Sequence, residues 1–152
     1  MSIADKLARL GIELPEVTAP LGAYTAARVA AGLVYTSGQL PLLNGALSAT
    51  GKVGAAVDLE TAQVAARVCA LNALAAAAAA VDGVDKLTGV VKVTVFVAAT
   101  PAFTEHPAVA NGASELFIQV FGESGRHVRA AVGVASLPKD APVEVEVVFA
   151  LD

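Results

Sequence analysis

The stretch HVRAAVGVASLPKDAPVEVEVVFAL, residues 127–151, decides the fold. Two apolar runs rich in valine and alanine, His127–Ser136 and Val143–Leu151, flank the segment Leu137–Pro142, which contains two prolines and an aspartate. Proline fixes φ at the second position of a turn, and aspartate tolerates tight turns. The pattern therefore predicts a strand, a turn and a second strand.

Three charged side chains interrupt these apolar runs. Arg129 is the single charge after the opening histidine of the first run, and Glu144 and Glu146 share one face of the second, because side chains alternate along a strand. An isolated buried charge costs several kcal/mol or more, so the guanidinium must find a carboxylate. Arg129 either pairs with Glu144 or Glu146 and holds the sheet, or faces a cleft and binds a ligand's carboxylate. Spacing alone favours the structural pair, since such pairs are common.

The composition predicts one domain with unusually apolar surfaces. Of the 152 residues, 56% are hydrophobic and 16% charged, against roughly 45–50% and about 25% in ordinary globular chains. The excess is alanine, valine and leucine rather than aromatic residues. A domain of this size has a limited interior, so some apolar surface is expected to meet other subunits. The composition therefore predicts an oligomer.

Several classes of protein are disfavoured by simple features. The apolar stretch Val68–Val81 is too short to span a membrane, and the N-terminus carries Asp5 and no apolar core of a signal peptide. A lone cysteine, Cys69, fits a reducing cytoplasm, and two histidines without ligand spacing make a metal site improbable. A net charge of −4 offers no general attraction for nucleic acid.

The N-terminal part of the chain predicts a short helix and then a hairpin. Ser2–Leu10 forms one or two helical turns capped by Ser2, and residues 1–19 are treated as an arm on a domain spanning residues 20–152. Two strands, Ala23–Val29 and Leu33–Gln39, are joined through a glycine-containing turn. The first would contain Tyr24. The second closes with Ser37-Gly38-Gln39, and its Ser-Gly pair lets backbone approach a ligand but more often marks only a strand end.

Two helices and a central strand follow. Asp58–Asp82 is the strongest helical prediction, with Asp58 as cap and Cys69 as a buried, inert thiol. Gly89–Ala99 is typical of a covered central strand, and Thr104–Phe121 of a second helix. The buried stripe of that helix comprises Val109, Ala113, Leu116, Phe117, Val120 and Phe121.

Polar residues of the second helix and the two histidines invite a functional interpretation, but ordinary roles are commoner. Asn111 lies roughly opposite the apolar stripe, so it is either solvated or turned toward a neighbouring subunit, with solvation as the default. His106 and His127 are acid–base candidates, although unpaired histidines at a surface or strand end are far commoner.

The predicted order is ββ(β)αβαββ, which indicates an α+β fold with both helices on one face of a single sheet. The other face is then exposed or packed against partners. No P-loop, dinucleotide fingerprint or Ser–His–Asp spacing occurs.

Several motifs together carry a resemblance to a known family. They are Tyr24, VYTSGQLP (34–41), KVTVFV (92–97), Asn111 and VRAAVGVASLPKDAPVEVEV (128–147). With these in matching order from Pro20 to the C-terminus, the chain resembles the Rid family of reactive-intermediate deaminases. That family is also called the YjgF or L-PSP endoribonuclease family.

The resemblance implies a chorismate-mutase-like homotrimer, with sheets lining a central barrel and a cleft between each pair of subunits. The family's substrate-carboxylate arginine falls on Arg129, and its water-positioning glutamate on Glu144. The cleft tyrosine falls on Tyr24. The remaining substrate-binding positions fall on Ser37, Gly38 and Asn111 and on the backbone around Ala131.

The implied chemistry is hydrolysis of a 2-imino or enamino acid to a 2-keto acid and ammonia, without a cofactor. Arg129 would hold the substrate carboxylate through a bidentate, charge-assisted pair, and Glu144 would orient or deprotonate water. The ligand is thus a small carboxylate-bearing metabolite.

The arginine motif departs from that of typical deaminating members, which have proline-alanine before the arginine and serine or threonine, then cysteine, after it. Here Val128 precedes Arg129, and Ala130-Ala131 follow, so position 131 offers only backbone groups. A trimer that binds or senses 2-keto acids without catalysis is the second hypothesis. RNA cleavage or inhibition of translation is the third, disfavoured by an acidic pI and few aromatic residues.

Overall fold

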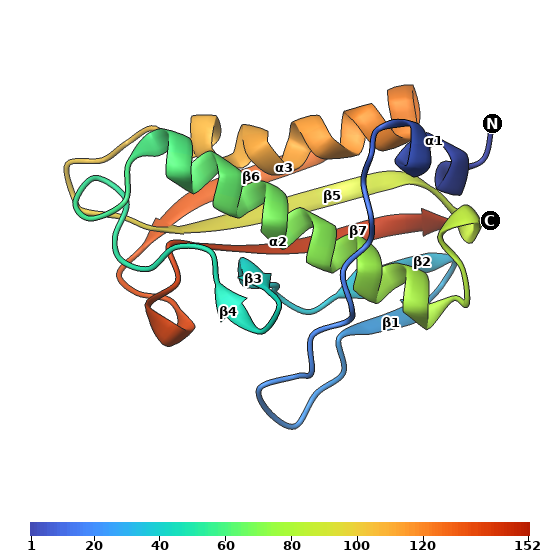
Figure 1. The fold of residues 1–152 in the computed structure, drawn as a ribbon, viewed down its shortest axis with the longest axis horizontal. Helices are drawn as coiled ribbons and strands as arrows, with labels where there is room; N and C mark the ends of the chain where they lie inside the picture. The colour runs from blue at the N-terminus through green and yellow to red at the C-terminus, as the bar shows by residue number, and fades with distance from the viewer.

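The computed structural model describes residues 1–152 as one sheet covered on one face by helices (Figure 1). The predicted α+β fold and its element order are confirmed. In chain order the elements are α1 (Ile3–Arg9), β1 (Ala27–Ala30), β2 (Leu33–Thr36), β3 (Leu42–Leu43), β4 (Ala46–Leu47), α2 (Leu59–Ala80), β5 (Leu87–Ala98), α3 (His106–Phe121), β6 (Val128–Val134) and β7 (Val143–Leu151), with short 3-10 turns η1 (Val84–Lys86), η2 (Gly122–Gly125) and η3 (Pro138–Asp140).

The main sheet has five strands in the order β1-β2-β7-β5-β6, and β3 and β4 form a separate small ribbon. All neighbours in the main sheet are antiparallel except β5 and β6, which are parallel. The predicted strand, turn and strand of residues 127–151 are all present. However, β6 and β7 do not pair with each other, because β5 lies between them.

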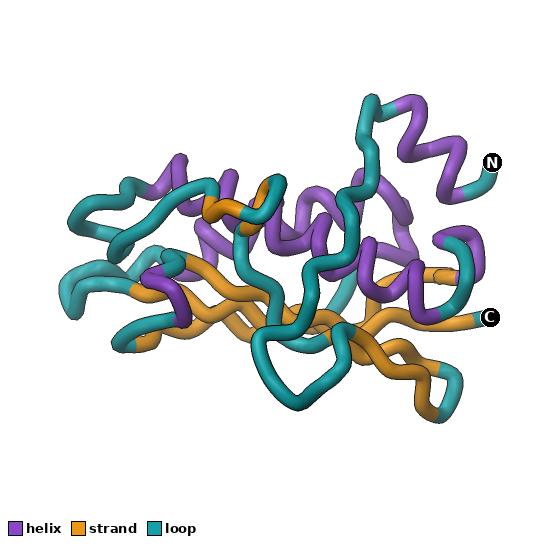
Figure 2. The backbone as a smooth tube through the Cα atoms, turned by 60° about the horizontal axis from the view of Figure 1, so that its bottom comes forward, coloured by secondary structure: helices purple, strands orange, loops and turns teal.

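Helices α2 and α3 cover one face of this sheet and leave the other bare, as the turned view of Figure 2 shows. Val93, Val95 and Val97 of β5 and Phe149 of β7 are completely buried beneath the helices, where they pack in one core with Phe117 of α3. All six residues of the predicted stripe on α3 are buried. The buried face of α2 consists largely of alanine, which lets the two helices approach closely over the sheet.

Side chains on the bare face, here called the open face, follow from the strand register. Tyr35, Lys92 and Val128 lie in one row across the sheet, since Tyr35 is opposite Val148, and Lys92 is opposite both Val148 and Val128. Glu144 lies in another row, opposite Phe96, which in turn is opposite Val132. Tyr35, Val128 and Val132 are exposed.

The first hairpin is shorter than predicted. Strand β1 begins at Ala27, so Tyr24 lies in the bend before the strand and not within it. Ala31 and Gly32 form a two-residue turn with positive φ values of 51° and 75°, which fits a tight hairpin. Strand β2 ends at Thr36, and the hydroxyl of the next residue, Ser37, donates to the Thr25 carbonyl (2.6 Å).

The N-terminal helix forms as predicted and lies against the core. Ser2 and Asp5 make a capping box, in which each side chain accepts from the other's backbone N–H. The Ala4 N–H donates to the Asp85 carboxylate (2.8 Å), which ties α1 to the turn before β5. The chain then crosses the outer side of α2 to reach β1 (Figure 1).

Helix α2 is longer than the apolar stretch Val68–Val81 considered in the sequence. By length and composition alone, Leu59–Ala80 could cross a membrane. Its most apolar window is 67% buried inside the protein, however, against the sheet and α3. Its apolar character is therefore accounted for by packing within the fold.

Candidate functional site

The Arg129 guanidinium is held by three acceptors on α3. It donates to Asn111 Oδ1 (2.8 Å), Ser114 Oγ (3.1 Å) and the Pro107 carbonyl (3.3 Å). Positions 107, 111 and 114 follow helical spacing and so share one face of α3. This face lies beside β6, and the contacts fix the direction of the guanidinium. Asn111 is exposed, but its amide has a defined role and is not merely solvated.

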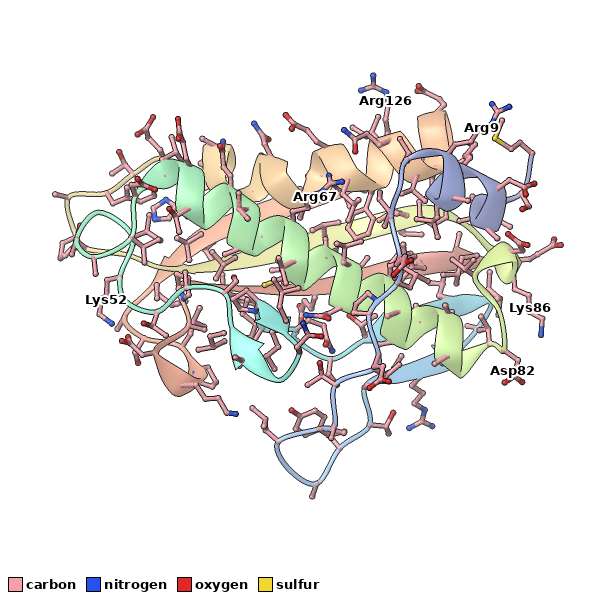
Figure 3. The ribbon with its side chains drawn as sticks, in the orientation of Figure 1. Arg9, Lys52, Arg67, Asp82, Lys86 and Arg126 are labelled. Carbon is pink, nitrogen blue, oxygen red and sulfur yellow. The ribbon has the colours of Figure 1, made fainter.

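Arg129 retains donors for a ligand. An arginine has five N–H donors, and the three bonds to α3 leave one on Nε and one on Nη2 without a partner. The residue is exposed and pairs with no carboxylate. The structural ion pair with Glu144 or Glu146 is therefore wrong. The single ion pair of the chain joins Arg126 and Glu123 (3.0 Å), and Arg126 projects outward beyond α3 (Figure 3).

His127 extends the contacts of Arg129. Its Nε2 lies 2.8 Å from Ser114 Oγ, and its Nδ1 lies 2.6 Å from the Gly125 carbonyl oxygen. Half-burial lowers the pKa of His127, and the nearby Arg129 charge lowers it further, against the opposing effect of the Gly125 hydrogen bond. The interpretation of His127 as an unpaired strand-end histidine is therefore wrong, because both of its ring nitrogens are bonded.

Glu144 lies on the open face beside Gly38. A Cβ atom on Gly38 would sit 2.7 Å from Glu144 Cδ and 2.9 Å from its Oε2, so only glycine leaves room for this carboxylate. Backbone bonds between Gln39 and Val145 bring the two segments together. Burial raises the pKa of the Glu144 carboxyl, and the neighbouring Glu146 charge raises it further. The Gly38 N–H has no partner within the chain.

Tyr24 and Ser37 lie near Gly38 but are engaged in local contacts. The Tyr24 hydroxyl accepts from the Leu21 N–H (3.0 Å), and its ring is exposed. The Ser37 hydroxyl donates to Thr25, which holds the bend before β1. Tyr24 and Gly38 line a hollow of about 30 Å³, far smaller than a usual ligand pocket.

The predicted site residues thus fall into two groups. One, here called the arginine half-site, comprises Asn111, Arg129 and Ala131. Arg129 and Ala131 face the helix side, since their partners Val93 and Val95 are buried there. The other, the glutamate half-site, contains Glu144, Gly38, Ser37 and Tyr24.

Neither half-site is a full-sized pocket. The hollow beside Arg129, lined also by Ser114, Arg126 and His127, has a volume of about 200 Å³. Ligand pockets usually measure roughly 300–1,000 Å³. One chain therefore brings together the members of each half-site, but it does not bring the two half-sites together.

Comparison with known proteins shows which family the chain belongs to. The family model described as "YjgF/chorismate_mutase-like, putative endoribonuclease" matches residues 4–150. The chain belongs to the YjgF family. Protein TCP17 of Trypanosoma cruzi, which is similar to this YjgF chain, is 44% identical over 99% of the chain and 94% of TCP17.

Solved structures of the YjgF fold agree over nearly the whole chain. The protein Atu1372 of Agrobacterium tumefaciens, of unknown function, is 43% identical and superposes with a TM-score of 0.90, covering 99% of this chain and 92% of its own. A protein of Shewanella oneidensis named as a putative endoribonuclease is 30% identical with a TM-score of 0.95, covering 99% of this chain and 100% of its own. These similarities establish family and fold.

Sequence reasoning did not identify Pro107, Ser114 and His127 as contacts of the arginine half-site. The signal for Pro107 and Ser114 was present, because they lie one helical turn on either side of Asn111. His127 could not be found in this way. Its partners depend on how η2 turns the chain from α3 into β6.

Proposed function

We propose that the chain is a deaminase that hydrolyses 2-imino or enamino acids to 2-keto acids and ammonia at clefts between subunits of a homotrimer. The observation that carries the proposal is the division of the site. Arg129 offers free donors for a carboxylate, and Glu144 offers a base for water, yet they lie on different faces of one sheet. In the proposed trimer, a second copy of the chain supplies the glutamate half-site to each Arg129.

The surface of the chain supports such an assembly. Strand β6 is an edge strand, and edge strands present unpaired backbone groups to a neighbouring chain. Tyr35, Val128 and Val132 place exposed apolar side chains on the open face, where a partner would cover them. Subunits associating through this face and edge would bring β6 of one copy toward the glutamate half-site of the next.

The proposed reaction needs only side chains and water. The two free donors of Arg129 bind the substrate carboxylate, which orients the imine carbon. Water adds to that carbon while Glu144 accepts a proton, for which its raised pKa suits it. The proton passes to the nitrogen and gives a carbinolamine. Transfer of the hydroxyl proton to the amine, again through Glu144, then breaks the C–N bond as the carbonyl forms, and ammonia leaves a 2-keto acid. The unpaired Gly38 N–H is a further donor for the substrate.

Mixing two inactive variants tests the proposal. Arg129→Ala retains Glu144, and Glu144→Gln retains Arg129, so neither alone should hydrolyse imines generated by an amino-acid oxidase. After both are unfolded and refolded together, about a quarter of the sites in random oligomers should contain both intact residues, and activity should return to that level. Absence of activity in the mixture, with wild type active after the same treatment, would show that the halves belong to one subunit.

A non-catalytic trimer that binds 2-keto acids is the alternative, and one observation favours it. The Ser37 hydroxyl already donates to Thr25, and Ala131 has no polar side chain, so Glu144 alone is left to activate water. Glu144→Gln separates the two functions. A catalyst should lose its rate and keep its affinity for keto acids, whereas a sensor has no rate to lose. For either function we place the protein in the cytoplasm, where its single thiol, Cys69, stays reduced.

A further inference from the structure

We propose that Ser114 and His127 are positioning residues, which act on the ligand through Arg129. This inference rests on the proposed role of Arg129 as a carboxylate anchor. Three hydrogen bonds in series carry it: Gly125 to His127, His127 to Ser114, and Ser114 to Arg129. Ser114 was not among the site residues expected from the sequence, and His127 was named there only as an acid–base candidate.

The direction of each bond follows from the acceptors. The Gly125 carbonyl can only accept, so His127 Nδ1 carries the proton that lies between them (2.6 Å). In the neutral ring, Nε2 is then an acceptor, and the Ser114 hydroxyl donates to it (2.8 Å). With its hydrogen committed to His127, Ser114 Oγ presents its lone pairs to Arg129 Nη1 (3.1 Å). The backbone thus selects the tautomer, and the tautomer orients the hydroxyl.

Packing holds the start of this series in place. Gly125 is buried, and a Cβ atom there would lie 2.3 Å from the Phe117 carbonyl oxygen, so η2 lies directly on α3. The ring of Phe117 also meets the His127 ring edge-on, with centroids 6.1 Å apart. Arg126 and Arg129 line the same hollow as the imidazole, and the Arg129 charge favours the neutral form of the ring. These contacts hold the His127 ring in place.

These three hydrogen bonds in series are here called the relay. Without the bond to His127, the Ser114 hydroxyl could rotate its hydrogen toward a helix carbonyl or toward the guanidinium. Serine in a helix often donates to the carbonyl one turn earlier. Arg129 would then keep Asn111 and Pro107 but lose a defined third acceptor. The guanidinium would sample more orientations, and the ligand would have to overcome that freedom on binding.

The first experiment needs no ligand. Proton–nitrogen correlation spectra of the wild-type protein should show His127 as the neutral Nδ1–H tautomer at neutral pH. In His127→Phe, which keeps an aromatic ring against Phe117 but no ring nitrogen, rotation of the Arg129 guanidinium should become faster. An Nε2–H tautomer, or unchanged Arg129 rotation in His127→Phe, would overturn the inference.

The second experiment measures pyruvate affinity by calorimetry. His127→Phe should weaken binding by about 2- to 10-fold, the effect of one hydrogen bond, whereas His127→Gln, which offers an acceptor near the Nε2 position, should recover most of it. Ser114→Ala should weaken binding similarly and add little to His127→Phe. Equal affinities in all variants, or additive losses, would overturn the inference. If wild type itself binds no pyruvate, the proposed function fails, and the spectra still decide whether the relay orients Arg129.

Discussion

Arg129 and Glu144 project from opposite faces of the same sheet, on strands β6 and β7 that are separated by β5. Their register fixes this, because Arg129 is opposite the buried Val93, and Glu144 is opposite Phe96 on the open face. Rotation of the side chains alone cannot bring the two groups to one substrate. A shared substrate therefore requires a second copy of the chain, and each half-site can be tested separately.

Removal of Arg129 should abolish carboxylate binding without unfolding the protein. Arg129→Ala is expected to weaken 2-keto acid binding by about 100-fold, because charge-assisted bidentate bonds are the strong ones. Its partners Asn111 and Pro107 lie near solvent and can bond to water, so thermal stability should change little. Calorimetric titration and a melting curve check both points.

Arg126→Ala is the matched control for Arg129→Ala. It removes the same charge from the rim of the same hollow, but its side chain pairs with Glu123 at the surface. Binding should change by less than about threefold, in keeping with an exposed ion pair. Equal losses in the two variants would mean that net charge, and not the Arg129 anchor, governs binding.

Glu144→Gln should alter both catalysis and the pH dependence of stability. The folded-state pKa of Glu144 is raised above its unfolded value near 4.5. The folded state therefore holds the proton more strongly, and stability is lost as pH rises from the unfolded pKa through the folded one. Glu144→Gln should therefore raise the free energy of unfolding more at neutral pH than at acidic pH. Denaturant unfolding of both proteins at both pH values would show this.

The rate should have the opposite dependence on pH. A base must be unprotonated, so imine hydrolysis by wild type should fall as pH is lowered through the raised pKa of Glu144. Glu146→Gln is the control, since Glu146 is exposed and contributes only the smaller, repulsive part of the shift. Glu146→Gln should shift the dependence of the rate on pH toward lower pH without abolishing imine hydrolysis. A profile unmoved by Glu146→Gln and a rate unaffected by Glu144→Gln would show that another group is the base.

Gly38→Ala should impair catalysis more than stability. The new Cβ would meet the end of the flexible Glu144 side chain, which can swing away, and not rigid backbone. The carboxylate would then leave its catalytic position, with an expected loss of at least about tenfold in rate. In a Glu144→Ala background the same substitution should have almost no effect on stability. A comparable loss of stability in both backgrounds would mean that Gly38 is required by the backbone itself.

A charge on the open face should disrupt the oligomer. Val132→Asp places a carboxylate on an exposed apolar position of the edge strand, in the row that contains Phe96 and Glu144. Light scattering after size-exclusion chromatography should show a monomer, and imine hydrolysis should disappear with assembly. Val64→Asp, at an exposed position on α2, is the control and should leave both unchanged. A monomeric Val132→Asp that retains activity would contradict the shared site.

The sequence alone predicted the elements and their order, because local patterns encode them. Asp58 capped α2 as expected, β7 matched Val143–Leu151, and the apolar stripe of α3 was buried in full. The predictions from sequence that were wrong concerned interactions between distant residues, which local patterns do not contain. Tyr24 lies in a bend before the first strand, and the neighbouring Thr25 accepts a bond from the Ser37 hydroxyl, twelve positions away.

The tertiary structure decided which charged and polar groups meet. Alternation along a strand placed Glu144 and Glu146 on one face, but it could not say that β5 would separate β6 from β7. Strand order depends on pairings between segments far apart in the chain, which a local pattern does not record. That order keeps Arg129 away from its own Glu144 and gives it acceptors on α3, with free donors left for a ligand.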